Sequence, residues 1–238
     1  MSSTSAVFIG DGSLLVQCAT AWRAAGHRID CIASHDSAIV EWAASNGVAA
    51  VRVDADSEIA LLPGEFDFLF SIANLHVLPP GLIKRAGKLA INFHDGPLPR
   101  YAGLNAPAWA LIAGEKTHGI TWHEMTDSVD AGRIVRQVTF AVPEEGTALA
   151  LNARCYEAGL AAFTSMAQDI AIGELAPVAQ VGPRSYFRRN QKPEALATLD
   201  FTRPAAELAA LVRALDFGSY ANPLAKPKIW LGDDILLV

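Results

Sequence analysis

Asn92 and His94 are the residues whose types and spacing most directly indicate chemistry. They follow an apolar run, and residues two apart on a strand point to the same face. The carboxyl ends of strands are where open α/β sheets place their sites. Asp130, in the tight turn Asp130-Ala131-Gly132, can bring a carboxylate to the same place. A donor amide, a titratable histidine and an aspartate predict an acyl-transfer site, although the spacing equally fits a turn asparagine and a loop-anchoring histidine.

Two loops are candidates for contact with a substrate. The first, Gly10-Asp11-Gly12-Ser13, resembles a phosphate-binding turn but lacks the third glycine of a dinucleotide fingerprint and the lysine of a P-loop. Its simpler interpretation is a tight turn in which Ser13 caps the following helix. The second loop, 94–103, contains prolines that stiffen it and glycines that let a ligand approach the backbone.

The remaining histidines favour structural roles. His118 and His123 lie near several carboxylates, yet five residues apart on a strand they point to opposite faces. No HExxH or comparable ligand pattern is present, so we predict no metal. His27 and His35 are isolated and are predicted to lie at the surface.

Strands and helices must alternate to position these residues. Apolar periodicity predicts strands at 6–9, 29–33, 48–53, 66–72, 89–93, 119–125 and 134–142. It predicts helices at 15–25, 39–44, 80–86, 104–113 and 147–172. This alternation is typical of βαβ units. We therefore predict an α/β fold, a Rossmann-like and mostly parallel sheet with helices on both faces.

The character of the chain changes near Pro177. Prolines and a basic cluster follow, namely Arg184, Arg188, Arg189 and Lys192. We interpret this stretch as a connection, with residues 1–182 forming a catalytic domain and 183–238 a linker and partial C-terminal subdomain. The latter is expected to hold an amphipathic helix at 204–215 and strands at 228–231 and 235–238.

Composition limits the possible functions. Of 238 residues, 51% are hydrophobic, which excludes a disordered chain. The formal charge of −6 argues against a wide nucleic-acid-binding face. No apolar run is long enough to span a membrane, and no secretory signal is visible. Three unpaired cysteines fit a reducing compartment, so we expect a soluble, cytoplasmic protein.

The site motifs resemble those of formyltransferases that use 10-formyltetrahydrofolate. Asn92-x-His94, the loop through Leu98-Pro99 to Gly103, and Asp130-x-Gly132 match the family's motifs in order. The resemblance implies that an amine attacks the formyl carbon, Asn92 and His94 stabilise the oxyanion or move protons, and Asp130 orients His94. It implies folate-binding roles for Leu75, His76, Val77, Leu78, Thr126, Asp127 and Val129. Substrate contacts are expected from Gly10, Asp11, Gly12, Ser13, Gly96 and Arg100.

One subgroup shows the greatest similarity, the formyltransferase domains at the front of nonribosomal peptide synthetases and polyketide hybrids. Gly96 and Pro97 stand where the wider family commonly has serine and leucine, which removes a hydroxyl. The resemblance implies an aminoacyl carrier-protein acceptor and neighbouring synthetase domains as partners. Initiator tRNA is the second candidate acceptor, although the acidic balance weakens it. A nucleotide-sugar amine is a third candidate, which no feature of the sequence supports. A non-catalytic domain that binds folate or a partner is the alternative outside the enzymes.

The apolar ending, 229–238, resembles the start of the small OB-like subdomain of related enzymes. We therefore expect this chain to be the front portion of a longer polypeptide.

Overall fold

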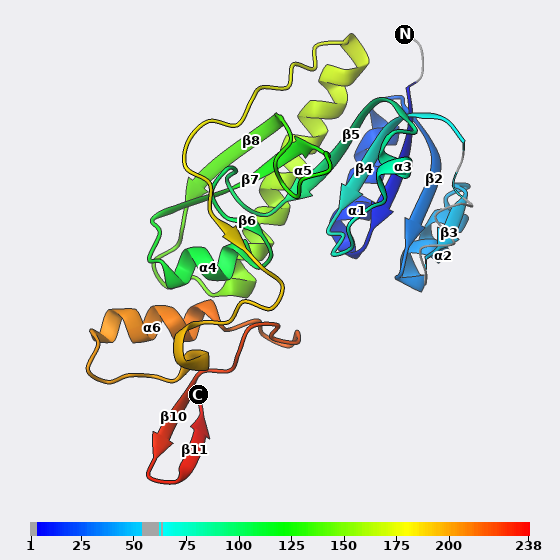
Figure 1. Ribbon diagram of the computed structural model, residues 1–238. Coiled ribbons are helices and arrows are strands. Elements are labelled where there is room, and N and C mark those ends of the chain that lie inside the picture. The colour runs from blue at the N-terminus through cyan, green and yellow to red at the C-terminus, as the bar shows by residue number, and fades with distance from the viewer. Residues whose placement is uncertain (1–3, 54–61, 63) are drawn as a thin grey trace.

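The computed structural model describes residues 4–53, 62 and 64–238. A seven-stranded sheet of order β3-β2-β1-β4-β5-β7-β8 forms its centre (Figure 1). Its strands are β1 (Ser5–Gly10), β2 (Arg28–Ser34), β3 (Ala50–Arg52), β4 (Phe66–Ile72), β5 (Ala86–His94), β7 (Thr117–Glu124) and β8 (Ile134–Ala141). The strands from β3 to β5 pair in parallel, whereas β7 and β8 are antiparallel to their neighbours. The predicted mostly parallel α/β sheet is confirmed.

Helices cover both faces of this sheet. The helices are α1 (Gly12–Ala24), α2 (Ser37–Ser45), α3 (Pro80–Ile83), α4 (Ala106–Ile112), α5 (Ala148–Ile172) and α6 (Ala205–Ala214). Leu14 of α1, Ile39 of α2 and Phe163 of α5 share one buried cluster with Phe8 and other strand residues. Leu82 of α3 belongs to the cluster on the opposite face. Burial of each such side chain contributes about 1.5–3 kcal/mol, so the two clusters hold the layers together.

Two short strands brace the region after β5. β6 (Ala102–Gly103) pairs in parallel with β9 (Tyr186–Phe187), far along the chain. The ring of Phe187 stacks on Trp109 of α4 at a centroid distance of 4.8 Å. These strands were not predicted, because two residues carry no readable periodicity. The segment after Val178 thus packs beside the loop that follows His94.

The C-terminal part contains a 3₁₀ turn (Glu194–Ala197), α6 and a hairpin of β10 (Lys228–Leu231) and β11 (Asp234–Leu237). The hairpin forms a sheet of its own and projects beyond α6 (Figure 1). Trp230 is 54% exposed, and most of its apolar neighbours in the hairpin are exposed as well. The two predicted C-terminal strands are therefore present as a strand pair.

The prediction that His27 lies at the surface is wrong. Its ring is buried, stacks on Trp22 at 4.1 Å, and lies 2.9 Å from the carbonyl oxygen of Ala167 through Nε2. Gly26, with a φ of 86°, ends the α1 region and turns His27 back beneath α5. Among the described residues, no helix is long and apolar enough to cross a bilayer.

Candidate active site

Strands β5 and β7 place the side chains of Asn92, His94, Thr121 and His123. Asn92 pairs with His123 and His94 with Thr121 in the antiparallel ladder, so these side chains share one face. Phe93 and Trp122 alternate with them and pack toward α5, where Trp122 Nε1 donates to the Gly159 carbonyl at 3.1 Å. The apolar residues therefore anchor the strands on α5 while the polar residues point to the opposite face.

Asp130 reaches this face from the turn that follows β7. It has a φ of 51°, in the left-handed region that aspartate tolerates better than most residues. Its Oδ2 accepts a hydrogen bond from the Gly103 N–H at 2.8 Å and lies 3.7 Å from Nδ1 of His94. A Cβ at Gly132 would lie 1.9 Å from the Glu124 carbonyl oxygen, so the turn requires glycine there. The spacing Asp130-x-Gly132 thus has a direct geometric cause.

The tautomer of His94 is set by the backbone. Nε2 lies 2.7 Å from the carbonyl oxygen of Tyr101, which can only accept, so Nε2 carries a proton and donates it. Nδ1 is then the nitrogen that faces Asp130. A Cβ at Gly96 would lie 2.7 Å from that Nε2 and 3.0 Å from the Tyr101 oxygen. Glycine at position 96 therefore makes room for the His94–Tyr101 hydrogen bond.

His123 contacts Asn92 and Asp130, and its predicted structural role stays a prediction. Its Nε2 lies 3.2 Å from Oδ1 of Asp130 and 3.2 Å from Nδ2 of Asn92, while Nδ1 donates to the Glu124 carbonyl at 2.8 Å. The register with Asn92 could have revealed this contact, had the pairing of β5 with β7 been known. His118 does lie on the other face, where Nε2 donates to the carbonyl of Asp95 at 2.8 Å.

Charge in the site is centred on Asp130. Burial by itself would raise the pKa of this carboxyl, but His94, His123 and the Gly103 N–H hold the pKa well below its usual range. Asp130 is therefore ionised at neutral pH. The site contains a buried carboxylate between two imidazoles.

The residues expected to bind folate lie in two segments, 75–78 and 126–129, and differ in their exposure. Leu75, Val77 and Val129 are exposed apolar side chains, whereas Leu78 is buried in the core cluster beside α3 and supports its segment from beneath. His76 is exposed and stacks on His35 at 4.6 Å. His35 is half-buried, so its predicted surface position is correct only in part.

The two segments are held from the C-terminal part of the chain. Arg189 Nη2 donates to the Leu75 carbonyl at 2.5 Å, and Arg184 Nη2 donates to the Val129 carbonyl at 2.7 Å. Thr126 shapes the second segment by donating to the Ser128 carbonyl at 3.0 Å. Asp127 in the same turn is exposed.

The loop after β1 differs from a phosphate cradle. A Cβ at Gly10 would lie 1.8 Å from the Ile72 oxygen, so glycine serves close packing of β1 and β4. Asp11, and not Ser13, is the N-cap residue of α1, and its side chain makes no capping bond. Its carboxylate instead accepts from Ser34 Oγ at 2.7 Å and the His35 N–H at 3.0 Å. A carboxylate at this helix end disfavours a bound anion. Gly12 and the exposed Ser13 begin α1.

The guanidinium of Arg100 is engaged by the protein itself. It pairs with Glu115 and lies 5.3 Å from the Tyr101 ring centre. It therefore braces the loop whose Tyr101 carbonyl holds His94.

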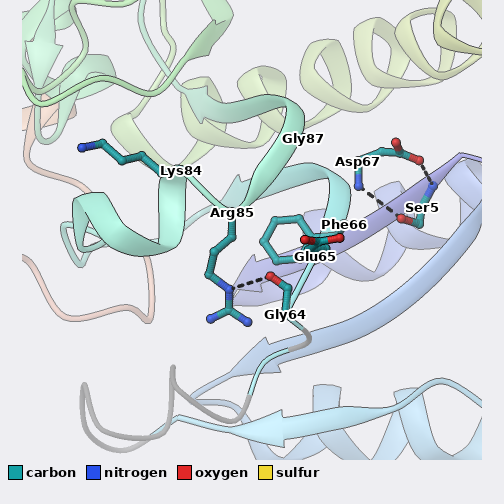
Figure 2. Close-up of a pocket in the computed structure, with 8 residues that line it drawn as sticks. All are labelled: Ser5, Gly64, Glu65, Phe66, Asp67, Lys84, Arg85 and Gly87. Carbon is teal, nitrogen blue, oxygen red and sulfur yellow. Dashed lines mark hydrogen bonds between the residues drawn. The ribbon is translucent and has the colours of Figure 1, made fainter.

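A hollow of about 690 Å³ lies elsewhere, near the amino ends of β1 and β4 (Figure 2). Some of its polar groups bond to one another: the Ser5 N–H donates to Asp67 Oδ2 at 2.9 Å, and Arg85 Nε donates to the Gly64 carbonyl at 3.2 Å. None of its lining residues belongs to the site around His94. Within the described part of the chain, no group of three or more His, Cys, Asp or Glu side chains is placed to hold a metal.

Comparison with known proteins identifies the fold and the family of this chain. The formyl transferase family matches residues 33–166. A sugar N-formyltransferase from Shewanella sp FDAARGOS_354 is 18% identical, with a TM-score of 0.78 over 99% of this chain and 96% of its own. A 4-N formyltransferase from Francisella tularensis is 17% identical, with a TM-score of 0.82 and the same coverage. The N-formyltransferase from Helicobacter canadensis, solved with folinic acid and dTDP-3-aminofucose, is 17% identical, with a TM-score of 0.71 over 90% of this chain and 80% of its own. These structures share the fold, and the family match spans more than half of the sequence. The chain belongs to the formyl transferase family.

Proposed function

We propose that this protein transfers the formyl group of 10-formyltetrahydrofolate to an amine. The observation that carries the proposal is the convergence of Asn92, His94 and Asp130 on one face of the sheet. In the reaction the amine nitrogen bonds to the formyl carbon, the bond from that carbon to the folate nitrogen breaks, and one proton passes from the amine to the folate nitrogen. The site must therefore stabilise an oxyanion and handle a proton.

Asn92 stabilises the oxyanion, and His94 handles the proton. One N–H of the Asn92 amide donates to the Phe93 carbonyl at 3.0 Å, and the other, which faces Nε2 of His123 at 3.2 Å, turns to the formyl oxygen as charge develops there. One such donor lowers the free-energy barrier by about 2.7–4 kcal/mol. His94 accepts the amine proton at Nδ1, because its Nε2 proton is committed to Tyr101. Ionised Asp130, at 3.7 Å, stabilises the imidazolium that forms.

We assign folate contact to exposed apolar side chains of the two expected segments. Leu75, Val77 and Val129 lie open to solvent, where each can offer apolar contact to a flat ring. Together with His76, Thr126 and Asp127, they are the residues we assign to folate contact. A structure of the same fold was solved with folinic acid, which supports a folate as the cosubstrate.

For the acceptor we favour the amino group of a nucleotide-linked sugar over a carrier-bound aminoacyl group. Several solved neighbours are sugar N-formyltransferases, and one was solved with dTDP-3-aminofucose. Arg184 and Arg189 place positive charge beside both folate segments, where an anionic nucleotide is attracted. The carrier-bound aminoacyl group stays as a second candidate, because the sequence around Gly96 and Pro97 resembles that of synthetase domains.

Parallel assays with separate acceptors test both the formyl transfer and the choice of acceptor. The protein is incubated with 10-formyltetrahydrofolate and, separately, a dTDP-amino sugar, an aminoacyl carrier protein or methionyl-tRNA. Formylated product is identified by mass and tetrahydrofolate release is followed in parallel. We expect equimolar product and release with the amino sugar. Formylation of the carrier alone would overturn the acceptor assignment, and no product with any amine would overturn the proposed function.

A further inference from the structure

We propose that Asp95 is a positioning residue whose carboxylate acts as a second counter-charge for the proton that His94 gains at Nδ1. This inference rests on the proposed function and deepens it. Oδ1 of Asp95 lies 3.9 Å from Nδ1 of His94, on the same ring nitrogen that faces Oδ2 of Asp130 at 3.7 Å. Because Nε2 donates to the Tyr101 carbonyl, both carboxylates act on one nitrogen.

The backbone of Asp95 is held by two buried side chains. Its carbonyl oxygen accepts from Nε2 of His118, on β7, at 2.8 Å. It also accepts from Sγ of Cys155, on α5, at 3.8 Å. Burial lowers the pKa of His118, and Nδ1 of this ring has no hydrogen-bond partner among the described residues, so the neutral form with its proton on Nε2 fits. The peptide that carries Asp95 is thus fixed from two elements.

The side chain of Asp95, unlike its backbone carbonyl, has no structural role of this kind. In the described part of the chain, its carboxylate makes no hydrogen bond to another residue, and its one ionic contact is with His94. The side chain is 27% exposed. A carboxylate that anchors nothing and faces a catalytic nitrogen is suited to act on charge, so its replacement by the isosteric amide should leave the fold intact.

Several groups set the charge of Asp95. Burial raises its pKa, His94 and His118 oppose that rise, and Asp130 adds to it. From α5, Cys155 and Tyr156 face it, and the Asp95 charge adds to the rise that burial causes in their pKa values. A carboxyl with a raised pKa loses its charge at a higher pH than an ordinary aspartate. The influence of Asp95 on His94 therefore grows as the pH rises and fades in acid.

The kinetic test compares the pH profile of kcat in wild type, Asp95→Asn and Asp95→Glu. A nearby carboxylate favours the protonated imidazole, so its loss should move the acid limb of kcat to lower pH by about one unit. We expect kcat on the plateau to fall roughly tenfold with KM nearly unchanged, and Asp95→Glu to restore the profile in part. Asp233→Asn, on the exposed hairpin, makes the same change in net charge and should match wild type.

A spectroscopic test does not depend on turnover. In ¹⁵N-histidine-labelled protein, with the His94 signals assigned from His94→Gln, these ring resonances should titrate at lower pH in Asp95→Asn than in wild type. An unchanged titration together with an unchanged kcat profile would overturn the role of Asp95. If wild type formylates no amine but the His94 resonances of Asp95→Asn still titrate at lower pH than those of wild type, the proposed function is overturned and the Asp95–His94 coupling stays in place.

Discussion

Oδ1 of Asp130 lies 3.2 Å from Nε2 of His123, while the other carboxylate oxygen faces His94. One ionised carboxylate therefore links side chains from two antiparallel strands. The contact holds Oδ1 of Asp130, while the Gly103 N–H holds Oδ2. Loss of either support should weaken the orientation of Asp130 toward His94.

Replacement of His123 by glutamine tests this support. The variant removes the imidazole beside Asp130 but keeps a polar side chain on the buried face of β7. We expect kcat to fall about 10–100-fold with the fold retained, because Asp130 loses a contact that orients it while Asn92, His94 and Asp130 all remain. Steady-state kinetics with circular dichroism checks this, and wild-type kcat would show that Asp130 needs no second imidazole.

Gly96 is the next position to test. In Gly96→Ala the new Cβ would lie 2.7 Å from Nε2 of His94, so the ring must move from the Tyr101 carbonyl. The expected result is a loss of kcat of roughly 10²-fold with a small change in stability, because a misplaced base catalyses poorly. Parallel measurement of kcat and of urea unfolding separates the two effects. Full activity in Gly96→Ala would show that the His94–Tyr101 bond is dispensable.

Gly132 is predicted to be required chiefly for the stability of the fold. A Cβ there would come within 1.9 Å of the Glu124 carbonyl, which is backbone and cannot yield. Gly132→Ala should lower the free energy of unfolding by about 3 kcal/mol, the scale of overpacking in a tight site. Gly81→Ala is the matched control, because nothing lies within 4 Å of its added Cβ. Equal urea midpoints for the two variants would contradict the packing argument.

Asp130 should also make stability depend on pH. The pKa of its carboxyl is lowered in the folded protein, so its contribution is complete above the unfolded value of about 3.9 and is lost as the pH falls through the folded value. Asp130→Asn should therefore be less stable than wild type at pH 7 by about 2 kcal/mol. Urea unfolding at falling pH should show the gap narrowing below about pH 4. A gap that stays constant in acid would mean that the charge of Asp130 does not stabilise the fold.

The sheet could be predicted because its strands and helices are long and periodic. The strand at 66–72 and the first C-terminal strand, 228–231, match their predicted bounds. Asn92 and His94 share a face for the same reason, a strand period of two. What escaped prediction depends on pairing between distant segments. Asp95, for example, acts on His94 only because β7 and α5 hold its peptide.

His123 illustrates the same limit. Its distance from Asp130 follows from a turn with a left-handed aspartate and from the register of β5 with β7. Spacing along the strand correctly places His123 and His118 on opposite faces, but it does not predict which residues each face contacts. The bond from Tyr101 to His94 likewise needs the loop geometry that Gly96 permits.

We propose that His94 and Asp130 carry out formyl transfer from 10-formyltetrahydrofolate to an amine. The direct measurement is the rate of formylated-amine formation by wild type, His94→Ala and Asp130→Ala, each shown by circular dichroism to be folded. We expect product and tetrahydrofolate in equal amounts from wild type, and no transfer in either variant. Near-wild-type turnover in either folded variant would contradict it.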